Sequence, residues 1–310
     1  MKRQQAFTDK EKKFLRGGLH CHTTRSDGRL TPRETLEYAA KQGFDFMALT
    51  DHQVYNFIDF APESGVLVIP GMEYGNDLIK GHGFRCFHTV CLGPSKEDGN
   101  GFEQDQTFEW GAAPSSEAYQ PFLDEIHEKK NLTILCHPQW SNTSAKYFET
   151  QSGNFAMEIW NSGSAINCDC DYDAAYWDEI LGKGKVIYGV ATDDAHSYDV
   201  LCKGWVMVKA EKNINSILKA LENGEFYSSC GPEIYDFYVD GGKAVIECSP
   251  VSRIRLQSDM HPNRVVTDKD GGLTHAEFDI DDFWAGDYDY VRISIVDEDG
   301  KKAWTNPIFL

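Results

Sequence analysis

Apolar runs that end in polar residues recur from residue 17 to about residue 222. Runs typical of strands occupy residues 17–22, 44–50, 66–70, 85–92, 132–136, 155–160, 185–191 and 204–209. Helical spacing of apolar residues is found at 31–43, around 116–130, near 172–182 and at 214–222. Strands that alternate with helices favour parallel strands joined by right-handed crossovers. The pattern therefore predicts an α/β fold with its chemistry at the carboxyl ends of the strands.

The first predicted helix carries end signals of its own. Thr31-Pro32-Arg33-Glu34 has the capping-box pattern, with proline at the first helical position. Gly43 is the expected stop.

Beyond about residue 224 the pattern changes to strand-like alternation broken by turns. The alternating segments are 234–239, 244–248, 252–257, 275–280 and 290–296. Asp299-Gly300 separates VRISIVDE from KKAWT and indicates a hairpin. No helix signal intervenes, so we predict a small antiparallel, immunoglobulin-like β-sandwich. The predicted domains are residues 1–230 and 231–310.

Side chains with metal-binding chemistry gather at the ends of the predicted strands. His20 and His22 are two residues apart, so on a strand they share a face, and Asp27 follows in the next loop. Later candidates follow apolar runs or lie within them: His52, Glu73, His88, His137, Asp194 and His196. Asp193 competes with Asp194 as a ligand, but the Asp-x-His spacing favours Asp194.

These nine nitrogen and oxygen ligands predict a site for several cations. Imidazoles and carboxylates that face one another in one pocket are costly without cations. Since none of the nine is a thiolate, they suit Mn²⁺, Fe²⁺ or Zn²⁺. Nine ligands are too many for one ion of ordinary coordination, and they fit two or three divalent metal ions with bridging groups. Cys168-Asp169-Cys170 is a weaker candidate for a soft metal.

Charge and composition indicate which kinds of partner and which cellular location to expect. The formal net charge of −19 disfavours long nucleic acid. A nucleotide substrate stays possible, because bound cations reverse the sign of a site locally. No apolar run approaches 18 residues, so no membrane partner is expected. We expect a cytoplasmic protein, because the nine scattered cysteines look like reduced thiols and MKRQQAFTDKEKKF has no leader pattern.

Taken in order, the motifs resemble those of the PHP family (polymerase and histidinol phosphatase). They are His-x-His-x4-Ser-Asp-Gly, Leu-Thr-Asp-His, Pro-Gly-x-Glu, a strand histidine, His-Pro and Asp-x-His, over about residues 17–230. The resemblance implies a distorted (β/α)7 barrel with a trinuclear metal centre. It also implies phosphoester hydrolysis by a hydroxide that bridges the metals.

The resemblance further implies how the ligands divide among the metals. The first metal takes His20, His22, Glu73 and Asp194; the second takes Asp27, His52 and His196; the third takes Glu73, His88 and His137, with Glu73 bridging. Asp194 and His196 are also expected to be catalytic. Arg25, three residues after His22, is a further catalytic candidate that could reach a phosphate oxygen.

Several functions are compatible with these motifs. The leading expectation is a metal-dependent phosphoesterase that hydrolyses a small phosphomonoester or phosphodiester, nucleotide-like in kind. An exonuclease on short oligonucleotides is an alternative. A carboxyl-ester or carbamate hydrolase is another, because FYSSCGP at 226–232 and WTNP at 304–307 resemble the two-domain carbaryl-hydrolase branch. A non-enzymatic binding protein is disfavoured, because a degenerate barrel should have lost ligands.

Other features keep two interpretations each. Trp140 follows the His-Pro motif and either stacks on a base or packs in the core. Asn161, at a strand end, is a candidate to orient a ligand or the substrate. Residues 93–114 are either a lid or a surface insertion. The β-sandwich, with Trp284, Tyr288 and Tyr290, is a wall over the substrate, a dimer contact or a glycan-binding module.

Overall fold

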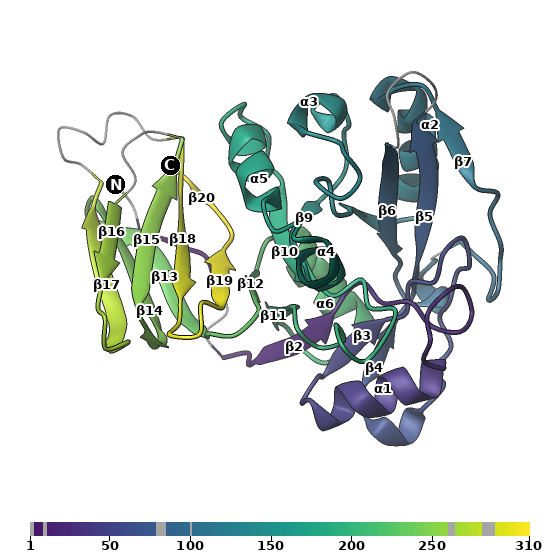
Figure 1. Ribbon diagram of the computed structural model, residues 1–310, viewed down its shortest axis with the longest axis horizontal. Coiled ribbons are helices and arrows are strands. Elements are labelled where there is room, and N and C mark those ends of the chain that lie inside the picture. The colour runs from purple at the N-terminus through teal and green to yellow at the C-terminus, as the bar shows by residue number, and fades with distance from the viewer. Residues whose placement is uncertain (1–2, 9–10, 79–84, 100, 260–263, 281–288) are drawn as a thin grey trace.

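The computed structural model describes residues 3–8, 11–78, 85–99, 101–259, 264–280 and 289–310. Figure 1 shows an elongated molecule, with all the helices in one part and a β-rich part at the other end. Both chain ends lie on the β-rich part (Figure 1). The fold is thus mixed α/β, as predicted. None of the helices in the described ranges is long and apolar enough to cross a membrane. Trp284 and Tyr288 lie outside the described residues.

Two groups of strands surround the interior of the helical part. β2 (Phe14–Gly18), β3 (Phe46–Ala48) and β4 (Leu67–Ile69) are parallel neighbours. The second group is a six-stranded sheet in the order β10-β9-β8-β6-β5-β7. Its strands are β5 (Gly71–Leu78), β6 (Cys86–Leu92), β7 (Gly111–Ala113), β8 (Leu132–Leu135), β9 (Ala156–Asn161) and β10 (Tyr188–Thr192).

The two groups meet beyond the ends of β2 and β10. A parallel bridge joins Cys21 to Ala195 there. One buried apolar cluster takes side chains from both groups, including Phe46 of β3, Val90 of β6 and Val190 of β10. The two groups of strands therefore share one apolar interior.

The expectation of an all-parallel set is wrong at two strands. Residues 205–209 pair antiparallel with β2. β6 runs antiparallel to both of its neighbours, β5 and β8. Only seven residues separate the end of β5 from the start of β6, and parallel neighbours need a crossover of a dozen residues or more. As a result, His88 projects from the middle of β6 and not from a strand end.

The predicted helices are confirmed, the first three with slightly shorter bounds and the last with the predicted bounds. They are α1 (Pro32–Lys41), α2 (Ser116–Glu128), α5 (Asp173–Leu181) and α6 (Ile214–Glu222). α1 has the predicted capping box between Thr31 and Glu34. Four short elements were not predicted: α3 (Ala145–Phe148), α4 (Ser162–Cys168) and the 3-10 turns η1 (Pro62–Ser64) and η2 (Lys96–Asp98). These are mostly single turns, too short for a helical period to be visible in the sequence.

A long sheet runs from the helical part into the β-rich part. Its order is β16-β15-β18-β19-β12-β11-β2-β3-β4, with β20 beside β18. The strands not yet given are β11 (Trp205–Lys209), β12 (Phe226–Ser229), β15 (Arg253–Ser258), β16 (Arg264–Thr267), β18 (Tyr290–Val296), β19 (Lys302–Thr305) and β20 (Ile308–Phe309). The predicted hairpin at Asp299-Gly300 is confirmed, since β18 and β19 pair antiparallel around it.

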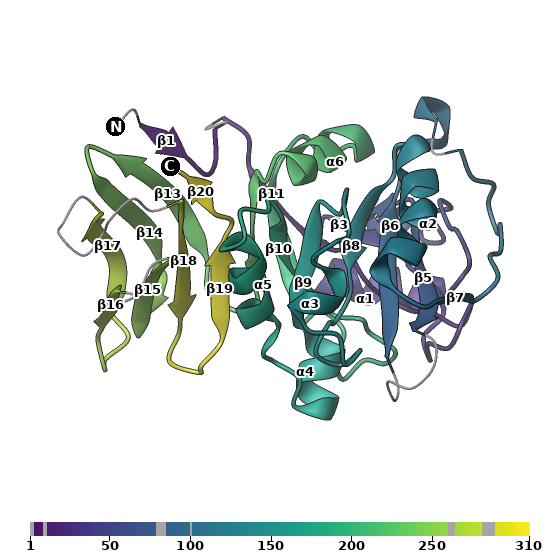
Figure 2. The ribbon, with the colours of Figure 1, turned by 90° about the horizontal axis from the view of Figure 1, so that it is seen from above.

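An antiparallel four-stranded sheet completes the β-rich part. Its order is β1-β13-β14-β17, formed by β1 (Gln4–Gln5), β13 (Ile234–Asp240), β14 (Lys243–Val251) and β17 (Leu273–Asp279). Figure 2 shows β1 beside β13. The two strands pair although they lie far apart in the sequence. A buried apolar cluster takes side chains from this sheet and from the end of the long sheet, and it includes Phe7. The N-terminal residues thus pack on the part predicted to begin at residue 231.

An ion pair also ties the two parts together. The guanidinium of Arg292 on β18 contacts both carboxylate oxygens of Asp178 on α5, at 2.8 and 2.6 Å. Arg292 is fully buried and lies over the ring of Trp177. Tyr290, on the same strand, is also buried, so it is not available as an exposed sugar platform.

Candidate metal centre

All nine predicted ligands belong to side-chain groups that lie close together, seven of them just beyond strands and two within strands. His20 and His22 follow β2, Asp27 lies in the next loop, and His52 follows β3. Glu73 and His88 project from β5 and β6. His137 follows β8, and Asp194 and His196 follow β10. The structure therefore brings together every residue of the predicted set, from segments up to 176 positions apart.

The most buried group consists of His20, His22, Glu73 and Asp194. One donor atom from each side chain lies within 4.8 Å of the others. His22 Nε2 is 3.0 Å from an Asp194 oxygen and 3.3 Å from Glu73 Oε2. His20 Nε2 is 3.3 Å from oxygens of the same two carboxylates. The two Nε2 atoms are only 3.2 Å apart, so they converge on one point.

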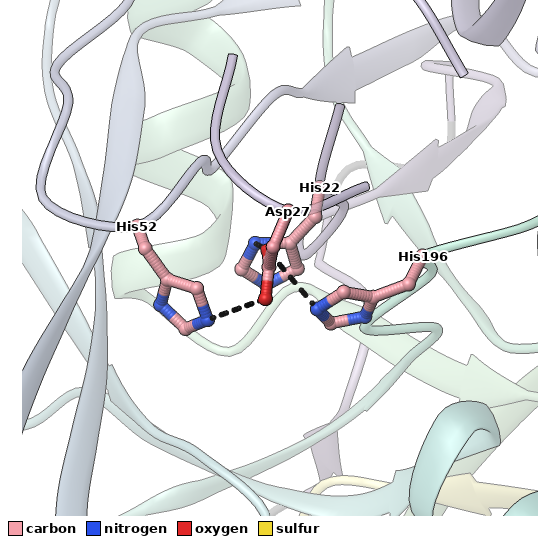
Figure 3. A group of neighbouring side chains, drawn as sticks. All are labelled: His22, Asp27, His52 and His196. Carbon is pink, nitrogen blue, oxygen red and sulfur yellow. Dashed lines mark ion pairs between the residues drawn. The ribbon is translucent and has the colours of Figure 1, made fainter. Parts of the chain in front are cut away.

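A second group, nearer the surface, consists of His22, Asp27, His52 and His196. Figure 3 shows the Asp27 carboxylate between the rings of His52 and His196. Asp27 Oδ1 is 3.3 Å from His196 Nε2, and Asp27 Oδ2 is 3.8 Å from His52 Nε2. The side chain of Asp27 is 56% exposed, whereas that of His22 is fully buried. This group therefore forms the open edge of the site.

A third set of contacts centres on Glu73. Its Oε1 atom is 3.1 Å from His88 Nδ1 and 3.4 Å from His137 Nε2. Its Oε2 atom is 2.8 Å from His52 Nδ1. Glu73 thus faces all three groups, the position that a bridging carboxylate needs.

Glu158 is an orienting residue that the sequence analysis missed. Its carboxylate lies 2.7 Å from His20 Nδ1 and accepts hydrogen bonds from the backbone N–H of His137 and from the side chain of Thr192. Its pKa lies below the usual value: burial raises it, but His20 more than offsets this effect. An ionised carboxylate only accepts, so Nδ1 of His20 donates to Glu158 and Nε2 faces the cluster.

The sequence did contain a signal for this residue. Glu158 interrupts the apolar run FAMEIW in the middle of a buried strand. A carboxylate in that position needs partners, and Asn161, which was predicted to orient a ligand, is one of them. Its amide donates to Glu158 Oε2 at 2.8 Å and to Asp194 Oδ2 at 3.2 Å.

The structure separates the two neighbouring carboxylates Asp193 and Asp194. Asp194 faces the histidines. Asp193 points the other way and accepts backbone N–H donors from residues 202–204, at 2.6–2.8 Å. Burial raises the pKa of Asp193 to about 6, although these hydrogen bonds by themselves lower it. Asp194 has a left-handed backbone, with φ of 50°, as does His137, with φ of 28°. Such strain in non-glycine residues is typical of functional sites.

Opposite charges shift the titration of the buried groups. Burial by itself lowers the pKa of His22, but the carboxylates of Asp194 and Glu73 outweigh it and raise this pKa to about 9. Burial also lowers the pKa of His88, and Glu73 outweighs it, so that the value is about 10. The pKa values of Glu73 and Asp194 lie well below their usual range, because the facing imidazoles outweigh the effect of burial, which raises them. Without cations, protons on the imidazoles balance the buried carboxylates.

The donor set fits divalent metal ions. Glu73 Oε2 and His52 Nδ1 are buried atoms that make no hydrogen bond within the described residues, despite their 2.8 Å separation. Buried polar atoms are otherwise almost always hydrogen-bonded, so these two suit a cation. Cys136 lies beside the cluster, but burial raises the pKa of its thiol well above the usual value. The available ligands are therefore nitrogen and oxygen, the kind that Mn²⁺, Fe²⁺ and Zn²⁺ accept.

Two other predicted residues have neighbours of their own. Arg25 donates to Asn56 Oδ1 at 2.8 Å and pairs with Asp105. These contacts come from its two terminal nitrogens, whereas a guanidinium carries five N–H donors. Trp140 lies at the site, with its ring centroid 4.9 Å from that of His137. Cys168 and Cys170 are free thiols, and neither belongs to a metal-binding group among the described residues.

Comparison with known proteins agrees with the geometry. The PHP domain matches residues 18–230. A two-domain protein containing a predicted PHP-like metal-dependent phosphoesterase, from Bacteroides vulgatus, is similar in fold, with a TM-score of 0.51 at 14% sequence identity. The match covers 99% of this chain and 98% of that one.

Two curated proteins are similar over short segments. A 5′-3′ exoribonuclease of Haemophilus influenzae is 44% identical over 59 residues, which are 18% of this chain and 22% of that protein. The DNA polymerase/3′-5′ exonuclease PolX of Bacillus subtilis is 46% identical over 41 residues, 13% of this chain and 7% of that protein. The chain thus matches less than a quarter of the length of either relative. The family match itself covers more than half of this chain, and on that ground the chain belongs to the PHP family.

Proposed function

We propose that this protein is a metal-dependent phosphoesterase that hydrolyses a small phosphomonoester or phosphodiester, nucleotide-like in kind. The observation that carries the proposal is the convergence of nine nitrogen and oxygen side chains into adjacent groups that share His22 and Glu73. Shared ligands bring cations close to one another, which is the arrangement that phosphoester hydrolysis uses.

The proposal includes the division of ligands expected from the family. One cation is held by His20, His22, Glu73 and Asp194, and a second by Asp27, His52 and His196. A third is held by Glu73, His88 and His137. We also propose that the strands of the helical part form a distorted (β/α)7 barrel around this centre, and that the β-rich part is the C-terminal β-sandwich.

Cations bound there supply an acidified water molecule and positive charge for the phosphoryl oxygens. The chain's own residues position these cations. Glu158 holds the proton on Nδ1 of His20, and Ser141 lies 3.0 Å from Nδ1 of His137, so both rings present Nε2 to the centre. Asp194 and His196, proposed as catalytic, lie at the buried and the open side of the site. Arg25 keeps its candidate role toward a phosphate oxygen.

An exonuclease on short oligonucleotides is the second candidate. The similarity of one segment to the Haemophilus influenzae exoribonuclease favours it. The net charge of −19 opposes a long nucleic-acid partner, because such partners are held by lysine and arginine contacts to phosphates. Hydrolysis of a carboxyl ester or carbamate stays a prediction that the same assays test.

Metal analysis combined with a substrate panel tests the proposal. We expect two or three Mn, Fe or Zn atoms per chain and turnover of p-nitrophenyl phosphate, bis-p-nitrophenyl phosphate or nucleotides. His20→Ala should lose metal and activity while its circular dichroism spectrum stays that of the wild type. His275→Ala, an exposed histidine of the β-rich part, is the matched control and should keep both. Turnover of carboxyl esters alone, or a metal-free active protein, would overturn the proposal.

A further inference from the structure

Trp110 is an exposed aromatic side chain at the edge of the metal centre. It is 46% exposed, although large aromatic side chains usually find apolar cover. Its ring centroid lies 5.6 Å from that of His52 and 5.4 Å from that of His88. The indole therefore touches two proposed ligands and is still open to solvent.

The backbone beneath Trp110 is shaped to receive it. Gly75 lies on β5, two residues beyond Glu73, and a Cβ atom built there would lie 2.3 Å from the indole. Any side chain at this position would displace the ring. Gln53, next to His52, donates from its amide to the carbonyls of Gly75 and Glu109, at 3.2 and 3.1 Å. The indole is thus held by the same segments that carry the ligands.

The segment that bears Trp110 is docked along its length. Phe108 donates its backbone N–H to the Gln53 carbonyl at 2.9 Å, and a bridge joins Thr107 to Val54. Phe102 is buried, and β7 pairs with β5. Arg25 pairs with Asp105 of the same segment. Residues 102–113 are therefore docked against the segments that carry the ligands, and these contacts place the indole at the site.

A second indole also lies beside His88. The ring centroid of Trp140 is 6.0 Å from that of His88, and that of Trp110 is 5.4 Å from the same imidazole. His88 thus has two tryptophans as neighbours. A group attached to a phosphoryl oxygen at this centre would emerge among aromatic side chains.

We propose that Trp110 is a specificity residue that stacks on a flat aromatic group of the substrate, either a nucleobase or an aryl leaving group. This inference rests on the proposed phosphoesterase function. Indole faces bind planar rings through stacking, which is worth about 1–3 kcal/mol per base and tolerates different bases. Cations would bind the phosphoryl group, and Trp110 adds selectivity for what the phosphate is attached to.

Binding and kinetics of Trp110→Ala and Trp110→Phe test the inference. The probes are adenosine 5′-monophosphate, p-nitrophenyl phosphate and glycerol phosphate, which share a phosphate and differ in the attached group. For the two aromatic probes, Trp110→Ala should raise the calorimetric Kd on the manganese-loaded protein, and KM, by about tenfold to a hundredfold. The Kd and KM for glycerol phosphate should stay within about twofold, and Trp110→Phe should keep most of the affinity. Tyr235→Ala, an exposed aromatic of the β-rich part, is the matched control.

The outcomes separate the two proposals. An equal loss for aromatic and alkyl phosphates would overturn the stacking role and indicate that Trp110 only shields His52 and His88. Weaker binding of p-nitrophenyl phosphate alone would assign an aryl leaving group, and weaker binding of the nucleotide as well would assign a nucleobase. Selective loss of aromatic binding in a protein that hydrolyses none of the probes would support Trp110 and overturn the phosphoesterase function.

Discussion

The metal centre and the core of the β-rich part are held together by opposite means. The β-rich core is made of buried apolar side chains from strands that alternate in and out, such as Phe237, Ile246 and Ile293. The metal centre is just as buried at His20 and Glu73 but consists of ionisable groups. Apolar burial stabilises a core without help. Crowded carboxylates and imidazoles need protons or cations to be tolerated. The β-rich core thus needs only its own apolar side chains, whereas the buried charges of the candidate metal centre need protons or cations to balance them.

The largest expected effect separates Asp194 from Asp193. Asp194→Asn should lower kcat/KM about 100-fold or more, because it removes a charged group from the most buried metal-binding group. Asp193→Asn should instead destabilise the metal-free protein by about 1–3 kcal/mol, because an amide nitrogen would face backbone N–H donors. Kinetics and thermal unfolding of both variants provide the check. Similar profiles for the two would mean that both carboxylates serve the same purpose.

A second test compares loss of metal with loss of apolar packing. Ile246→Ala should lower stability by about 2–5 kcal/mol whether or not metal is present, because it leaves a cavity in the β-rich core. Chelation removes the bound metal and should therefore destabilise the wild type. The loss should be about 3 kcal/mol for each site, if the free metal concentration before chelation was a hundred times the Kd of that site. Calorimetric unfolding with and without EDTA measures both. Glu73→Gln should respond little to EDTA, and a wild type that is equally insensitive would contradict the comparison.

A smaller effect is expected where the two parts are linked. Asp173 begins α5, the helix whose Asp178 pairs with Arg292, and it accepts the backbone N–H of Gln139 at 2.7 Å. Burial raises the pKa of Asp173 to about 8. The unfolded chain therefore ionises this group first, so the folded state loses stability as pH rises from about 4 to 8.

Asp173→Asn should remove this loss. Relative to the wild type, the variant should gain about 1 kcal/mol of stability per pH unit between pH 5 and pH 8, because the amide stays neutral. Denaturant unfolding at a series of pH values measures the difference in stability between the variant and the wild type. The contributions of the other titrating groups are nearly the same in both proteins and largely cancel in this difference. A constant difference across this range would show that Asp173 is ionised in the folded protein.

Some features of this protein are encoded locally and could be predicted. The capping box at Thr31 and the Asp299-Gly300 hairpin depend on neighbouring residues only. The nine candidate ligands could be found because strand periodicity assigns side chains to faces. Strand ends also gather at one edge when most strands are parallel.

Other features depend on contacts between distant segments, which no local pattern encodes. The antiparallel direction of β6, the pairing of β1 with β13 and the meeting of Glu158 with His20 each join parts of the chain that lie far apart. In the sequence, Trp110 lies within a predicted loop. Its position at the site depends on Gly75, which leaves room for the indole, and on Gln53, which donates to the neighbouring carbonyl of Glu109. The sequence by itself determined which groups could bind metal, because that is a property of residue types and spacing. Only the tertiary structure decided which of them face one another, because long-range packing sets strand direction and side-chain orientation.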